Sequence, residues 1–234
     1  MTIKTAMKAP ITAKIPIVFE DGEALVIDKP AGLPVDPPRN GGTCLADYFH
    51  TLKLGFKRPP IAVHRLDADT SGCLLLARNP KAVKRFAMAF QERLVGKIYL
   101  GIIAGELPES EGTIDLPLGK ISSAEKGWRM VRDAGGKPSV THWRIVSVKD
   151  GNSLVEFRPE TGRTHQIRVH AETGLGMPLL GDPVYGPIHG QPTGARRTML
   201  HAARITVERH GKPAIEASAP MPDDFKALGF ADIG

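Results

Sequence analysis

Asp67 stands in a short polar stretch, two residues after Arg65, between apolar runs at positions 61–63 and 73–77. Short continuous apolar runs are typical of buried strands, so we expect Asp67 in the connection between two strands of a sheet. Side chains in such connections often carry the chemistry of a protein. A carboxylate held there needs a partner, because an unpaired buried charge is costly. Taken alone, Arg65 and Asp67 also fit surface charges beside a turn at Thr70-Ser71-Gly72.

Five segments of the chain resemble, in the same order, those of the RluA-type pseudouridine synthases, which isomerise uridine within RNA. They are residues 28–35 (DKPAGLPV), 64–72 (HRLDADTSG), 97–99 (KIY), 158–170 (RPETGRTHQIRVH) and 181–186 (GDPVYG). Residues 200–202 (LHA) resemble a late segment of the same family. One such segment arises by chance, whereas five in order are specific to a family. The resemblance covers nearly the whole chain.

The reaction that this resemblance implies breaks the bond from ribose C1′ to uracil N1, rotates the base and rejoins it at C5. It involves no redox change, so we expect neither a cofactor nor a metal, and the sequence has no phosphate-cradling glycine loop or metal-ligand cluster. An ionised carboxylate near the sugar is required, as in glycoside cleavage. By resemblance this group is Asp67. It either attacks as a nucleophile or removes a ribose proton to give a glycal, and the sequence leaves both routes open.

The resemblance also implies roles for three residues around Asp67. Arg168 is the expected ionic partner that keeps the carboxylate charged. The ring of Tyr99 is expected to stack on uracil, and its hydroxyl to help remove the C5 proton. Arg65 is expected to fill the RNA stack once the target base is extruded, since a guanidinium stacks on bases while its charge meets phosphates. Without the family context, Arg168 fits a surface helix and Tyr99 fits a core.

The remaining expected RNA-binding residues lie beside these positions and shape the pocket: His64, Arg163, Thr164 and Gln166. His170 is expected to organise the pocket with them. His165 and His170 do not indicate zinc, because their spacing of five places them about 140° apart on a helix, whereas zinc helices use a spacing of four. Asp182 and Tyr185 are interpreted as structural residues of a tight turn.

The elements that must position these side chains follow from periodicity and turn residues. We expect a hairpin over Asp21-Gly22 and a helix over 44–53, capped by Thr43, with Leu45, Phe49 and Leu52 inward. A second helix begins at Asn79-Pro80, with its inward face at Val83, Phe86, Ala87 and Phe90. A short helix over 164–172 ends at Gly174.

Residues 97–105 are predicted to form a central strand. Two further hairpins are expected, 140–148 with 154–157 and 199–207 with 214–217. Hairpins outnumber strand-helix-strand units, so the predicted fold class is α+β, a mainly antiparallel mixed sheet flanked by a few helices. The resemblance implies the pseudouridine synthase catalytic fold with a central RNA-binding cleft. The glycine-rich stretch 108–137 is expected to hold short strands at best, with Trp128, Arg129 and Arg132 on an RNA-gripping arm or a surface hairpin without function.

Composition is that of a globular protein, with 234 residues, 41% hydrophobic, 24% charged and a net charge of +6. A basic balance suits a phosphate backbone, so RNA is the expected partner, with no obligate protein partner. The two cysteines have no metal spacing, and no stretch is a secretion signal or a membrane span. We therefore expect a cytoplasmic protein with a flexible tail at 1–14 and one catalytic domain at 15–232. No accessory RNA-binding module is expected before it.

Sequence reasoning thus favours an RNA pseudouridine synthase acting on a stem-loop of tRNA or large-subunit ribosomal RNA. A non-catalytic RNA-binding or ribosome-assembly protein on the same fold is the alternative. The combination of Asp67, Tyr99 and Arg168 argues against it, because a carboxylate repels phosphate and gives a pure binder nothing. An N-glycosylase that releases free uracil is the third hypothesis.

Overall fold

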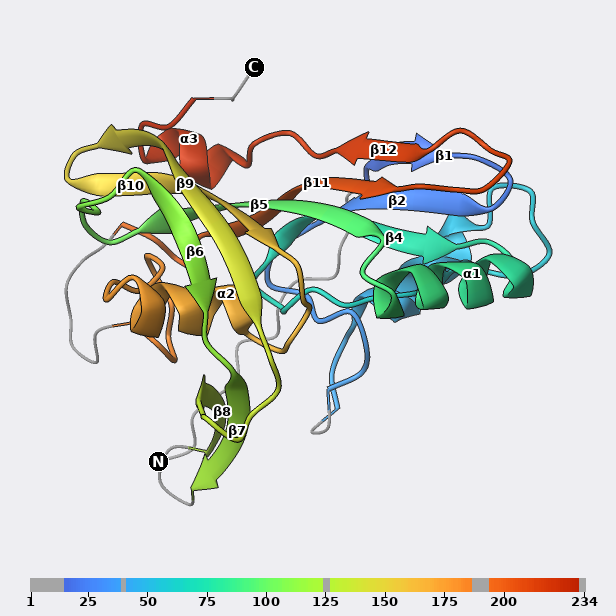
Figure 1. Ribbon diagram of the computed structural model, residues 1–234. Coiled ribbons are helices and arrows are strands. Elements are labelled where there is room, and N and C mark those ends of the chain that lie inside the picture. Colours follow the sequence, from blue (N-terminus) through green and yellow to red (C-terminus); the bar gives the residue numbers. More distant parts are fainter. Residues whose placement is uncertain (1–14, 39–40, 124–126, 187–193, 232–234) are drawn as a thin grey trace, which may run out of the picture.

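A computed structural model describes residues 15–38, 41–123, 127–186 and 194–231. Its centre is a ten-stranded sheet with the order β1-β2-β4-β11-β5-β10-β9-β6, to which β12 pairs beside β11 and β3 beside β4 (Figure 1). The strands of this sheet are β1 (Ile17–Glu20), β2 (Ala24–Lys29), β3 (Ile61–Ala62), β4 (Ser71–Ala77), β5 (Val95–Ile103), β6 (Glu111–Asp115), β9 (Val140–Lys149), β10 (Asn152–Pro159), β11 (Leu200–Val207) and β12 (Ile215–Ser218).

Antiparallel pairing dominates, as predicted, and among the described strands the β4–β11 pair alone runs parallel. The three predicted hairpins are present as β1–β2, β9–β10 and β11–β12, and β5 lies between β10 and β11 in the interior of the sheet. The α+β prediction is therefore confirmed. No helix in the described ranges has the length and apolar character needed to cross a bilayer.

The glycine-rich stretch is more regular than predicted. It contributes β6 to the main sheet and then forms a separate ribbon of β7 (Leu118–Ser123) and β8 (Gly127–Arg132). These two strands pair in register along their whole length, from Leu118 with Arg132 to Ser123 with Gly127. The ribbon extends away from the main sheet below α2 (Figure 1). We call it the β7–β8 arm.

Few helices accompany the sheet: η1 (Leu45–Leu52), α1 (Pro80–Gln91), α2 (Gln166–Val169), η2 (His170–Gly174) and α3 (Asp223–Ala227). The η1 segment is a 3-10 helix with the predicted buried face, but its cap is wrong in the sequence analysis. Cys44, not Thr43, is the N-cap, because the carboxylate of Asp47 accepts the Cys44 amide at 2.8 Å. The predicted helix over 164–172 begins two residues later and changes to a π-helical turn at His170.

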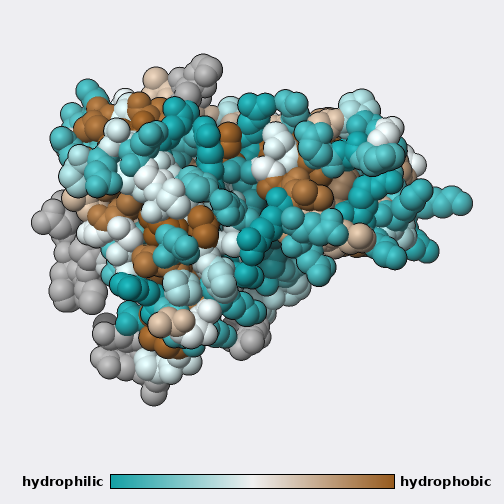
Figure 2. All heavy atoms as spheres, in the orientation of Figure 1, coloured by the Kyte–Doolittle hydropathy of each residue, from teal (hydrophilic) through white to brown (hydrophobic). Residues whose placement is uncertain are grey.

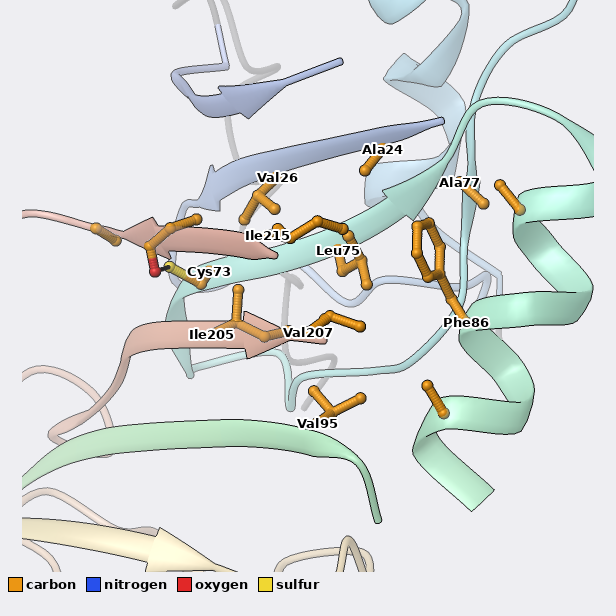
Figure 3. Close-up of a cluster of buried hydrophobic side chains, with 14 residues drawn as sticks. Ala24, Val26, Cys73, Leu75, Ala77, Phe86, Val95, Ile205, Val207 and Ile215 are labelled. Atoms are coloured by element: carbon orange, nitrogen blue, oxygen red, sulfur yellow. Dashed lines mark hydrogen bonds between the residues drawn. The ribbon is translucent and has the colours of Figure 1, made fainter. Parts of the chain in front are cut away.

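Helix α1 begins as predicted, since the Asn79 side chain accepts the amide of Ala82 at 2.9 Å and proline occupies the first turn. Its inward face is shifted from the prediction. Ala87 is exposed, and Ala82 and Ala89 are buried instead. Phe86 of this helix is fully buried against the sheet (Figure 3). Burial of a side chain of this size contributes about 1.5–3 kcal/mol.

Strand β4 leads out of the Asp67 connection and is buried along its whole length. Cys73 and Leu75 pack in the cluster under α1, whereas Leu74 and Leu76 pack in a second cluster with η1. Covering on both faces explains why this strand is continuously apolar. The prediction of a second buried strand at positions 61–63 is wrong, because β3 has only two residues and Ile61 is 53% exposed. One rigid strand therefore anchors the Asp67 connection.

Candidate active site

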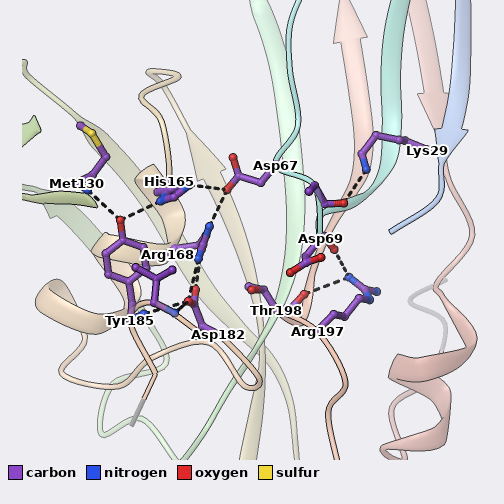
Figure 4. Close-up of polar contacts among 12 residues, drawn as sticks. Lys29, Asp67, Asp69, Met130, His165, Arg168, Asp182, Tyr185, Arg197 and Thr198 are labelled. Carbon is purple, nitrogen blue, oxygen red and sulfur yellow. Dashed lines mark hydrogen bonds and ion pairs between the residues drawn. The ribbon is translucent and has the colours of Figure 1, made fainter. Parts of the chain in front are cut away.

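The connection that carries Asp67 is held by a buried lysine. Lys29, at the end of β2 (Figure 4), has no exposed surface, and its ammonium donates to the carbonyl oxygens of Ala68 at 3.0 Å and Leu33 at 2.8 Å. The amide of Gly32 donates to the same Ala68 carbonyl at 2.8 Å. The resemblance had marked residues 28–35 without a role for them. The structure gives them one, because they fix the backbone directly after Asp67.

A second cation holds the other side of this connection. Arg197 donates to the carbonyl oxygens of Asp69 at 2.9 Å and Leu200 at 3.0 Å, and it pairs with Asp224 of α3 at 2.6 Å. The sequence analysis did not identify Arg197.

The close approach of β4 to β11 requires Gly72, whose φ is +105°, because a Cβ there would lie 2.2 Å from the carbonyl oxygen of Ala202. Only glycine adopts this backbone without strain.

Asp67 and Arg168 meet, as the resemblance implied. Arg168 Nη1 lies 3.3 Å from Asp67 Oδ2, across 101 positions of sequence. The carboxylate side chain is 30% exposed, whereas that of Arg168 is 8% exposed. His165 Nε2 approaches the same Oδ2 at 3.8 Å. Within the described ranges Asp67 Oδ1 has no hydrogen-bond partner, so one carboxylate oxygen is held and the other is open.

The strongest contact of Arg168 is with Asp182, which the sequence analysis treated as a turn residue. Arg168 Nε and Nη2 donate to the two oxygens of Asp182 at 2.7 and 2.9 Å (Figure 4). Asp182 Oδ1 also accepts the amides of Val184 at 2.9 Å and Tyr185 at 3.0 Å. Burial opposes ionisation of Asp182, but these bonds outweigh it and lower its pKa. Asp182 therefore fixes the guanidinium that faces Asp67.

Charges around Arg168 keep it cationic. Burial disfavours its charge, but the hydrogen bonds that it donates to Asp182 and the negative charges of Asp182 and Asp67 raise the pKa of Arg168 above its usual value. A bidentate arginine–carboxylate pair is geometrically specific as well as strong. Both residues lie in segments of the family resemblance, 158–170 and 181–186. That shared membership was the signal by which sequence reasoning could have paired them.

Tyr99 lies mid-strand in β5, paired with Phe157 of β10 and Ala202 of β11. Its half-buried ring packs between two apolar clusters, one of which includes Leu66 beside Asp67. Burial raises the pKa of Tyr99 well above its usual range, and the negative charge of Asp67 raises it further. The phenol is therefore neutral at neutral pH and lies within electrostatic reach of the carboxylate.

His64 and Arg65, three and two residues before Asp67, point in different directions. Arg65 is 74% exposed and pairs loosely with Asp36 at 3.3 Å. His64 faces the protein interior, where Nε2 accepts the amide of Leu75 at 2.9 Å and the ring stacks on Phe90. Burial, with the positive charge of Lys97, lowers the pKa of His64 to about 3. His64 thus holds the connection against β4, and its role in RNA binding stays a prediction.

Gln166 uses its whole side-chain amide inside the protein. Its oxygen accepts from Thr161 Oγ1 at 2.7 Å and from the Arg163 amide at 3.0 Å, and its nitrogen donates to Val140 O and Thr141 Oγ1, each at 2.9 Å. These bonds tie the start of α2 to β9. Gln166 therefore shapes the pocket wall.

The other expected RNA contacts near α2 differ in exposure. Thr164 is exposed, while Arg163 is half-buried and donates to the Pro138 carbonyl at 3.3 Å. His170 is buried between Thr141 and the Leu116 carbonyl. His165 instead faces Asp67, so the two imidazoles have separate partners. Among the residues that the structure describes, no three His, Cys, Asp or Glu side chains are grouped as metal ligands.

Comparison with known proteins gives the chain a family likeness. The family model described as RNA pseudouridylate synthase matches residues 23–173. An uncharacterized RNA pseudouridine synthase of Zymomonas mobilis is 54% identical over 94% of this chain and all of its own length. The ribosomal large subunit pseudouridine synthase D of Nitrosomonas europaea is 38% identical over 91% of this chain, which spans 63% of that protein.

Solved structures agree with this likeness. Human RNA pseudouridylate synthase domain containing 1 superposes with a TM-score of 0.74 at 30% identity, covering 92% of this chain and 87% of its own. Human RNA pseudouridylate synthase domain containing 4 gives a TM-score of 0.75 at 27% identity, with 90% of each chain covered. The structural similarity therefore covers at least nine-tenths of the chain, well beyond the matched motifs.

Proposed function

Because the chain belongs to the RNA pseudouridine synthase family and is an RluA-type isomerase, we propose that it modifies a uridine in a stem-loop of large-subunit ribosomal RNA with Asp67 as its catalytic carboxylate. Relatives named as ribosomal large subunit enzymes, from three bacteria, favour ribosomal RNA over tRNA. Loops suit sequence-specific recognition because their bases are unstacked.

The observation that carries this proposal is the asymmetric environment of Asp67. Arg168 and His165 both approach Oδ2, which leaves Oδ1 open to the ribose of an extruded nucleotide. Asp182 fixes Arg168 in turn, so the cation does not need to reorganise during the reaction. Both open routes, attack at the sugar and removal of a ribose proton, use this free oxygen.

Tyr99 supports the uracil in this proposal. Its raised pKa disfavours the phenolate, so the hydroxyl is a poor anionic base for the C5 proton. The ring itself offers an apolar face within reach of the Asp67 charge, which suits stacking on uracil during rotation. Of the two roles expected from the resemblance, the structure supports the stacking role more strongly.

Arg65 is free to act in base extrusion. Its pair with Asp36 joins two exposed side chains, and pairs of that kind contribute about 0–1 kcal/mol. RNA phosphate or an exposed base stack replaces Asp36 at little cost. The side chain starts two residues from Asp67, so it reaches the space that the target base vacates.

A groove of about 670 Å³ runs beside the start of β5 and the end of β10, and Lys97, Arg158 and Arg204 are among its lining residues. Lys97, which lines this groove, also lies close enough to His64 for its charge to help burial lower the pKa of that imidazole. Polar side chains also cover most of the face in Figure 2, where apolar groups form separate patches. These features support a path for the RNA backbone next to the site.

Mapping pseudouridines in total RNA tests the proposal. Cells that lack the gene should lose pseudouridine at one or a few ribosomal RNA loop positions, and the wild-type gene should restore them. The Asp67→Asn gene should not restore them, although its product still binds the RNA. Loss at tRNA positions instead would refute the substrate, and restoration by Asp67→Asn would refute the role of the carboxylate. Abasic sites at these positions would indicate an N-glycosylase.

A further inference from the structure

We propose that His165 is a positioning residue that links the β7–β8 arm to Asp67, so that contact of the arm with RNA sets the orientation of the reacting carboxylate. The inference rests on the proposed role of Asp67. It assigns functions to His165 and Tyr185, to which the sequence analysis gave no part in catalysis, and to Trp128, which it placed on an RNA-gripping arm or a surface hairpin.

A chain of three contacts joins the arm to the carboxylate. The amide of Met130 in β8 donates to Tyr185 Oη at 3.1 Å, and Tyr185 Oη lies 2.9 Å from His165 Nδ1. His165 Nε2 then lies 3.8 Å from Asp67 Oδ2 (Figure 4). The four residues come from β8, the 181–186 turn, the start of α2 and the β3–β4 connection. Each link therefore crosses between separate parts of the fold.

The Asp67 carboxylate sets the direction of this chain, because it can only accept and so favours the His165 tautomer with its hydrogen on Nε2. Tyr185 Oη accepts the Met130 amide, so its own hydrogen is available for His165 Nδ1. An Nδ1 that accepts leaves the hydrogen of the neutral ring on Nε2, which faces Asp67. Burial lowers the pKa of His165, and although Asp67 opposes this, the net shift favours the neutral ring. His165 thus presents an N–H dipole to the oxygen that Arg168 also holds.

Trp128 gives the arm a second contact with the same imidazole. The Trp128 and His165 rings lie 5.1 Å apart between centroids, tilted by 31°. Trp128 is nevertheless 47% exposed, so part of its surface is open to a nucleic acid base. The ammonium of Lys120 lies 5.1 Å from this ring. A base that stacks on Trp128 therefore affects the position of the His165 ring through this direct ring contact.

The backbone of His165 has an uncommon conformation. Its φ of +53° lies in the left-handed region, which is unfavourable for a residue with a side chain. Such conformations persist where surrounding contacts over-determine them, and they gather at functional sites. Tyr185 provides one such contact on the ring edge, and Trp128 provides another on the ring face.

A double-mutant cycle tests the link in the full-length protein. The measured quantities are the single-turnover rate at saturating RNA and, separately, the RNA dissociation constant. Trp128→Ala and Tyr185→Phe should each slow the rate about tenfold in the wild-type background, a coupling within the range for contacting residues. In the His165→Ala background neither should slow it further. Effects on RNA affinity should be equal in both backgrounds.

Ile121→Ala provides the matched control, because Ile121 is an exposed residue of the same arm that pairs with Arg129 across the ribbon. Its effect on the rate should be the same with and without His165. The link is refuted if Trp128→Ala slows the reaction equally in both backgrounds, or leaves the wild-type rate unchanged. An active Asp67→Asn enzyme would instead overturn the proposed function, so the two failures are distinguishable.

Discussion

The two carboxylates that contact Arg168 should differ in how much stability the protein loses when each is replaced by asparagine. Asp182→Asn replaces one oxygen of a fully buried carboxylate with an amide that faces an Arg168 N–H, donor against donor. Breaking a buried pair costs about 3–5 kcal/mol. Asp182 Oδ1 keeps its bonds from Val184 and Tyr185, so we expect a loss near the lower end, about 3 kcal/mol. Asp67 is 30% exposed and contacts Arg168 at 3.3 Å, so Asp67→Asn should cost about 0–1 kcal/mol.

Chemical denaturation at neutral pH measures both losses. Thermal denaturation gives a second measurement. For a chain of this size, a loss of 1 kcal/mol in unfolding free energy lowers the melting temperature by about 2–4 °C, so Asp182→Asn should lower it by about 6–12 °C. Asp67→Asn should lower it by less than about 4 °C and abolish turnover. Equal destabilisation by the two variants would contradict the division into a structural carboxylate and a reacting one. Retained turnover in a folded Asp182→Asn enzyme would contradict the role of Asp182 in fixing Arg168.

Three further predictions follow from single residues. Arg65→Ala should keep the melting temperature but slow single-turnover tritium release about 10- to 100-fold, because base extrusion costs a few kcal/mol; an unchanged rate refutes the extrusion role. Gly72→Ala should lower the unfolding free energy by about 1–3 kcal/mol, since its φ of +105° strains any other residue; unchanged stability in denaturant argues against the close β4–β11 contact. His64 has a pKa of about 3 when folded and about 6.5 when unfolded, so its contribution to stability is complete above pH 6.5 and falls as the pH drops towards 3. His64→Gln should therefore reduce the slope of unfolding free energy against pH, between pH 3 and 6.5, by up to about 1.4 kcal/mol per pH unit. An unaltered slope contradicts burial of a neutral ring.

Sequence reasoning predicted the fold well where local signals and burial agree. The cap at Asn79, the turn at Asp21-Gly22 and the apolar run of β4 each specify their element with residues close in sequence. Helix faces were less predictable, as Ala87 shows, because small residues fit either side of a helix. The β7–β8 arm was expected only as short strands at best, on an arm or a surface hairpin, since glycines and charges hide its regular pairing.

In the site, the resemblance alone predicted that Asp67 and Arg168 lie in contact. It gave no site role to Asp182 and Lys29, although its segments include both, and it did not include Arg197; the physical reason is common to all three. Each acts by satisfying a buried charge or carbonyl of a segment distant in sequence, and no periodicity or spacing records such a contact. The start of η1 was likewise misplaced by one residue, because the Asp47 carboxylate accepts the Cys44 amide and makes Cys44 the N-cap.

Tritium release from RNA labelled at uracil C5 measures the central claim most directly. Purified wild-type protein should release tritium from the ribosomal RNA loop that mapping identifies. Asp67→Asn should bind the same RNA with unchanged affinity and release none above background. Release at the wild-type rate by Asp67→Asn would contradict the account, whatever the positions of Arg168 and Tyr99.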